Sequence, residues 1–163
     1  MLSTVEYNTI TKLYADNLYR HALKVNGDAV LAQDIVQNVF LKLWQMREKV
    51  HVESVKALLY KMTYQQGIDL YRSEKSRTER ESIAMDQSHD TASQYGQHDL
   101  LEIAFKALTP EAKHLILLRD YEGYSYAEIS DLVSQSLSSV KVNLYRARKQ
   151  MQQQLLTLEN EVK

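Results

Sequence analysis

The chain has 163 residues, with 20 Lys or Arg against 21 Asp or Glu and no cysteine. Without cysteine it can form neither a disulfide nor a Cys-based metal centre. Its five histidines show no HxxxH or HExxH spacing, so we expect no metal site and no cofactor. With 4 Gly and 1 Pro it has few of the turns that β-rich folds need, and its apolar residues recur with a period near 3.6. These features predict an all-α protein.

Membrane insertion is not expected, because no apolar run approaches the roughly 18 residues of a membrane span. The N-terminal sequence MLSTVEYNTI lacks the cationic start and apolar core of a signal peptide. We therefore expect a cytoplasmic location.

Three helices are predicted before residue 80. The first covers about 5–25 and ends at Asn26-Gly27, where Gly favours a left-handed cap. The second begins at Asp28, a good N-cap residue. Its buried stripe comprises Ala29, Ala32, Ile35, Val36, Val39, Phe40, Leu43 and Trp44. The third begins near 52–54 and ends in the basic segment RSEKSRTER.

Residues 82–97, SIAMDQSHDTASQYGQ, break the helical pattern and are polar and rich in small residues. Such a segment buries too little apolar surface to become ordered, so we expect a flexible linker between domains 1–81 and 98–163. Cations gather on either side of it, at 72–80 and 141–149. Two basic patches around an acidic middle favour binding of a polyanion at two places, despite the net charge of −1.

The second domain is predicted to hold four helices, the last two forming a helix-turn-helix. Ser125 and Glu128 have the spacing of a capping box, and Thr109 with Pro110 starts the preceding helix. Ser136 caps the last helix, whose buried stripe is Val140, Leu144 and Ala147 or Met151. An ordinary helical hairpin with a solvated basic face is the alternative. The cap, the short turn and the basic second helix together favour DNA binding.

Four segments, in this order along the chain, resemble a bacterial RNA polymerase sigma factor of the extracytoplasmic-function group. They are DIVQNVFLKLW (34–44), LLYKMTYQQGIDLYR (58–72), LTPEAKHLILLRDYEGYSYAEIS (108–130) and SSVKVNLYRARKQM (138–151). The resemblance implies that 1–81 is sigma region two and 98–163 is region four. It implies an alternative sigma factor, not an enzyme, that binds core RNA polymerase through its β′ and β subunits and directs initiation at promoter DNA. An anti-sigma factor is a further implied partner.

The resemblance also assigns residues to each surface. Core polymerase would bind Asp34, Gln37, Asn38 and Leu41, and an outward Leu41 among polar groups suits a partner helix. The minus-ten element would bind Tyr64, Gln65, Arg72, Lys75 and Arg77. The family usually has Arg-Asn at Tyr64-Gln65, so Tyr64 either stacks on DNA or packs on protein, and packing is favoured. The loop 48–53, with Lys49, His51 and Glu53, matches the position where the family captures a flipped base.

The minus-thirty-five element would contact the N-terminal part of the last helix. The candidate residues are Ser138, Ser139, Lys141, Asn143, Tyr145, Arg146 and Arg148. Asn143 stands where the family often has Arg and has the amide needed to pair with adenine. Arg146 and Arg148 are expected to bind phosphates, although one of them could serve helix packing instead.

Three other classes of protein explain less of the sequence. A simple helix-turn-helix regulator leaves DIVQNVFLKLW and the first basic run unexplained. A nuclease needs clustered carboxylates for metal ions, and the acidic residues here lack convergent spacing. A structural adaptor leaves both basic patches unexplained.

Overall fold

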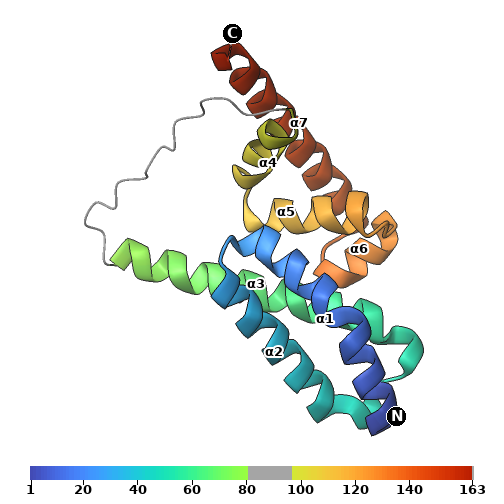
Figure 1. Cartoon of the computed structure of the whole chain (residues 1–163). Coiled ribbons are helices and arrows are strands. Elements are labelled where there is room, and N and C mark those ends of the chain that lie inside the picture. Colours follow the sequence, from blue (N-terminus) through green and yellow to red (C-terminus); the bar gives the residue numbers. More distant parts are fainter. Residues whose placement is uncertain (81–96, 163) are drawn as a thin grey trace.

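The computed structural model describes residues 1–80 and 97–162, and within these ranges the chain is helical and has no strand (Figure 1). The predicted all-α class is therefore confirmed. The predicted linker, 82–97, lies outside the described residues except for Gln97, where α4 begins.

The N-terminal module contains α1 (Thr4–Asn26), α2 (Ala29–Met46) and α3 (Val55–Arg80). Two short 3-10 turns, η1 (Arg47–Lys49) and η2 (Val52–Ser54), connect α2 to α3. The predicted caps are in place. Gly27 ends α1 with a φ of 71°, and the Asp28 carboxylate accepts hydrogen bonds from the first backbone N–H groups of α2.

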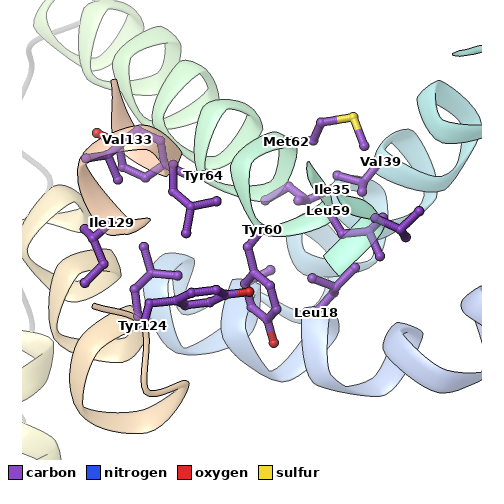
Figure 2. Packing of buried hydrophobic residues seen from close by; sticks show 14 of the residues in the cluster. Leu18, Ile35, Val39, Leu59, Tyr60, Met62, Tyr64, Tyr124, Ile129 and Val133 are labelled. Carbon is purple, nitrogen blue, oxygen red and sulfur yellow. The ribbon is translucent and has the colours of Figure 1, made fainter. Parts of the chain in front are cut away.

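Packing of one apolar face from each helix forms the core of this module (Figure 2). Leu18, Ile35 and Leu59 are completely buried there. Phe40 is buried as predicted, but Trp44 is only half-buried. Its ring meets the edge of Tyr7 at 4.9 Å between centroids, and the Arg47 guanidinium covers it at 4.0 Å.

The C-terminal module contains the predicted four helices, α4 (Gln97–Lys106), α5 (Pro110–Ile116), α6 (Tyr126–Val133) and α7 (Leu137–Val162). Thr109 caps α5 by accepting a hydrogen bond from the backbone N–H of Ala112 at 3.3 Å. A π-helical segment, η3 (Leu117–Tyr121), extends α5 and was not predicted from the sequence. Gly123 then ends it with a φ of 76°.

The two modules pack against each other along one interface, which we call the seam. It joins α1 and α3 of the first module to α5 and α6 of the second (Figure 1). Tyr60 meets Tyr124 at 5.9 Å and Tyr64 meets His114 at 4.9 Å between ring centroids. One continuous hydrophobic cluster therefore runs from Leu18 through the seam to Ile129 (Figure 2).

Candidate nucleic-acid interface

The helix-turn-helix is formed by α6 and the first turns of α7. Ser125 starts α6 with both hydrogen bonds of the predicted capping box, 3.1 Å from the Glu128 N–H to Ser125 Oγ and 3.3 Å from the Ser125 N–H to the Glu128 carboxylate. Ser134 ends α6 in the left-handed region with a φ of 54°. Ser136 then caps α7, because its Oγ accepts a hydrogen bond from the Ser139 N–H at 3.1 Å. The turn between α6 and α7 thus depends on Ser134 and Ser136 and contains no glycine.

The orientation of α7 is set by its apolar stripe. Val140, Leu144 and Ala147 are buried, as the sequence predicts, while Met151 is only half-buried. The stripe packs on α5 and α6. Side chains on the opposite side of the helix face solvent, which gives α7 a polar surface available to a ligand.

Four of the predicted contact residues, Ser138, Lys141, Tyr145 and Arg146, are exposed on this surface. Arg146 has neither an ion-pair nor a hydrogen-bond partner among the residues the structure describes. Its charge is therefore available for a phosphate. The preceding residue, Tyr145, is 62% exposed and presents an aromatic ring to solvent.

Asn143 and Ser139 are half-buried and already bonded to each other. The Asn143 amide donates to Ser139 Oγ and to the Gln135 side-chain oxygen, each at 3.2 Å. Both N–H groups of this amide are therefore engaged within the module. Bidentate pairing with adenine, which needs an amide N–H, would require Asn143 to release one of these bonds.

Arg148 has an internal partner. It donates a hydrogen bond to the Asp120 carboxylate at 2.6 Å. This bond is the main reason that the pKa of Arg148 is raised; desolvation acts in the opposite direction, and a contact with Tyr126 raises the pKa further. The bond to Asp120 ties α7 to η3. Arg148 thus matches the packing role that the sequence left open for one of the two arginines.

A basic cluster that the sequence did not reveal surrounds Tyr126, at the start of α6. The Arg119 guanidinium lies 4.5 Å and the Lys141 ammonium 5.9 Å from the centre of the Tyr126 ring. A hydrogen bond from Arg148 is the main cause of the lowered pKa of Tyr126. Arg119 from η3 and two cations from α7, Lys141 and Arg148, thus converge on one half-buried aromatic ring. Only the fold brings Arg119 to this surface, because it lies far from α7 in sequence.

The predicted minus-ten residues divide into two groups. Gln65, Arg72, Lys75 and Arg77 are exposed along α3, so their side chains can reach a phosphate backbone. Tyr64 instead is 9% exposed and packs on His114 in the seam. The interdomain packing that was favoured for Tyr64 is present, and Tyr64 is not accessible to DNA in this arrangement.

The loop between α2 and α3 presents Lys49, His51 and Glu53 to solvent. Val50 is buried beneath them and anchors the loop to the core. A backbone hydrogen bond of 2.8 Å from the Leu2 N–H to the Arg47 carbonyl holds the start of the loop. The three polar side chains are thus displayed on a fixed backbone.

All four predicted polymerase-binding residues lie on the exposed side of α2. Asp34, Gln37 and Leu41 recur at helical spacing opposite the buried face, with Asn38 beside them. Val30, 66% exposed, extends the same line by one turn, and Leu41 is 54% exposed. We call Val30, Asp34, Gln37, Asn38 and Leu41 the α2 stripe. Sequence reasoning missed Val30, although its spacing of four from Asp34 indicates it.

Two family models match the chain on either side of the predicted linker. Residues 10–77 match sigma-70 region 2, and residues 98–151 match sigma-70 region 4. RNA polymerase sigma factor SigV of Bacillus subtilis is 31% identical over 144 residues, which cover 87% of this chain and 86% of SigV. The chain belongs to the sigma-70 family of RNA polymerase sigma factors. It is an alternative sigma factor of the extracytoplasmic-function group, which directs transcription from specific promoters.

Other relatives agree with this assignment. The ECF RNA polymerase sigma factor SigE of Mycolicibacterium smegmatis is 25% identical over 158 residues, which cover 91% of this sigma factor and 61% of SigE. The fold is similar to that of the sigma factor RpoE in complex with the anti-sigma factor NepR from Bartonella quintana. That match has a TM-score of 0.70 and 20% identity, and covers 91% of this chain and 96% of that one.

The residues that the structure describes were also searched for metal sites and membrane spans. They contain no group of three or more His, Cys, Asp or Glu side chains placed to hold a metal ion. No helix in the same ranges is both long and apolar enough to cross a membrane.

Proposed function

We propose that this sigma factor docks on core RNA polymerase through the α2 stripe. The observation that carries this proposal is an exposed Leu41, one turn from the exposed Gln37 and Asn38, with the exposed Val30 near the start of the same helix. A large apolar side chain in the middle of a polar surface is typical of a protein-binding site. The α2 stripe lies outside the seam, which involves α1 and α3, so it is accessible in the docked arrangement.

The same sigma factor reads two promoter elements with its two modules. In this proposal Gln65, Arg72, Lys75 and Arg77 hold the minus-ten region, and α7 enters the major groove of the minus-thirty-five element. Exposed cations on α3 and the free charge of Arg146 support it. Such phosphate contacts position the protein, while Ser138, Lys141 and the rearranged Asn143 amide would read bases.

Catalysis remains with the polymerase in this proposal, and the sigma factor acts in the cytoplasm. An anti-sigma partner would hold it inactive by covering the α2 stripe. Support for such a partner comes from its fold neighbours. CnrH, solved in complex with the cytosolic domain of CnrY, matches with a TM-score of 0.65 at 17% identity, covering 93% of this chain and 88% of that one.

Binding to purified core polymerase tests the docking surface. The variant Gln37→Ala with Leu41→Ala should lose affinity, because it removes the apolar anchor and a neighbouring hydrogen-bonding group. Truncating such an anchor costs about 2 kcal/mol or more, a rise in Kd of roughly 30-fold. The matched control is Lys12→Ala, an exposed change on α1 and away from the stripe. Unchanged affinity of the folded double variant would refute the proposed surface.

A further inference from the structure

The seam buries two titratable rings, one from each module. His21 lies on α1 and His114 on α5, and they are 4% and 0% exposed. His21 Nε2 and His114 Nδ1 are 2.8 Å apart, within hydrogen-bonding distance. The rings of Tyr60, 5.4 Å from His21, and Tyr64, 4.9 Å from His114, enclose the pair. The modules thus share a hydrogen bond that is shielded from water.

The short contact excludes protonation of both rings, and burial disfavours protonation of either one. In a neutral pair, one nitrogen donates its N–H and the other accepts. Protonation of both rings would set two N–H groups against each other at 2.8 Å, and protonation of one would bury a cation. No carboxylate within the described residues lies in ion-pair range of either ring. The groups that face the pair are Arg20 and Lys24 from α1, Tyr60 and Tyr64 from α3, Lys113 from α5, and Glu122, which lines a shallow hollow with His21 and Lys24.

We propose that the His21–His114 pair is a proton-sensitive latch that holds the two modules of the free protein together. Further contacts across the seam keep the rings in register. The Lys113 ammonium donates to the Val25 carbonyl at 3.4 Å, at the C-terminal end of α1. The Lys24 ammonium lies 4.2 Å from the centre of the Tyr121 ring.

Gly67 is an independent sign that the backbone of α3 makes room for this pair. A Cβ at Gly67 would lie 3.3 Å from His114 Nε2 and 3.4 Å from the Asn26 amide nitrogen. Glycine in the middle of a helix is destabilising relative to alanine. Close approach of His114 gives a physical reason for a glycine at this position.

The direction of the pH dependence follows from burial. Burial, with Lys24 as a minor cause, lowers the pKa of His21 to about 4, and burial lowers that of His114 well below its usual value. Separation of the modules returns both rings towards the ordinary value near 6.5, so the separated state binds more protons as pH falls. Docking is therefore fully stabilised above pH ~6.5 and weakens as pH falls towards the docked values. For two rings the docking constant drops by at most about 600-fold between pH 7 and pH 5.

The latch itself does not depend on the proposed function, but its consequence for promoter recognition does. Elements centred at minus ten and minus thirty-five are about 25 base pairs apart, or about 85 Å along the duplex. In the docked form Tyr64 of α3 lies beside Gln135, in the turn that precedes α7. The two reading surfaces are then much closer than the promoter elements. The latch must open before both elements can be bound.

Small-angle X-ray scattering of the full chain between pH 7.5 and pH 5.0, at constant ionic strength, tests the latch. We expect the radius of gyration to rise from about 15 Å, the value for a compact chain of this length, to above 20 Å. Far-UV circular dichroism should show unchanged helix content. The variant His21→Phe with His114→Phe keeps aromatic packing but cannot titrate, and it should stay compact throughout. His51→Phe, an exposed change outside the seam, is the matched control and should open like the wild type.

Three outcomes would overturn the proposal: a folded wild-type chain that stays compact at pH 5.0, one that is already extended at pH 7.5, or a double variant that opens with the wild type. If the double variant does not fold, an NMR titration of the wild-type histidine rings decides instead. Two rings should then titrate well below the ordinary range, in step with the change in size. Ordinary titration of all the histidine rings would also overturn it.

Discussion

Replacing Arg146 with alanine should remove one phosphate contact and change how promoter binding depends on salt. Arg146 is exposed and has no ionic partner among the described residues, so its charge is free to displace a counterion from DNA. Each such contact contributes about 0.9 to the slope of log K against log salt. Arg146→Ala should therefore weaken binding about eight-fold at 0.1 M salt. When salt is raised from 50 to 200 mM, the factor by which the variant loses DNA affinity should be about 3.5-fold smaller than the factor for the wild type.

The assay is a titration of promoter DNA with holoenzyme reconstituted from core polymerase, repeated at several salt concentrations. Lys12→Ala, a loss of one exposed cation on α1, is the matched control and should leave the slope unchanged. Arg148→Ala should mainly affect stability, because Arg148 is tied to Asp120. Since both partners are about half exposed, that loss is at most about 1 kcal/mol. An Arg146→Ala slope equal to that of the wild type would refute the phosphate assignment.

Three further predictions address the seam, the cap and the core. Gly67→Leu should enlarge the radius of gyration already at pH 7.5, because the new leucine side chain would collide with His114. The control Ser73→Leu, on the exposed side of α3, should leave the radius unchanged. Equal radii for the two variants would contradict the seam. Ser125→Ala should cost about 1 kcal/mol and lower Tm by about 2–4 °C through loss of the capping box, and a Tm matching the wild type in calorimetry would disprove that role. Ile35→Ala should cost about 2–5 kcal/mol in chemical denaturation, whereas exposed Val30→Ala should cost under about 0.5 kcal/mol while weakening polymerase binding.

Local signals in the sequence are sufficient for the helices and their ends. Gly27, Asp28, Thr109 and Ser125 all act within one turn of their own position, so their cap roles are visible from neighbouring residues. The exposed Leu41 follows in the same way from helical period alone. Such features need no knowledge of the tertiary fold.

The seam and the internal bonds of the recognition helix could not be predicted in this way. His21 and His114 are 93 positions apart, and neither lies in a motif that marks it as buried. Arg148 meets Asp120 across 28 positions, and nothing local distinguishes it from Arg146. Such pairings depend on how helices cross in space, which the period of a single helix does not determine.

Transcription in vitro tests the central claim most directly. Purified sigma factor is added to core polymerase with a library of random promoter sequences, and the start sites of the transcripts are sequenced. We expect discrete starts preceded by two shared elements about 25 base pairs apart, and a change in the upstream element alone when α7 is altered at Ser138 or Lys141. A folded, inhibitor-free protein that yields no start sites beyond those of core polymerase alone would contradict the account.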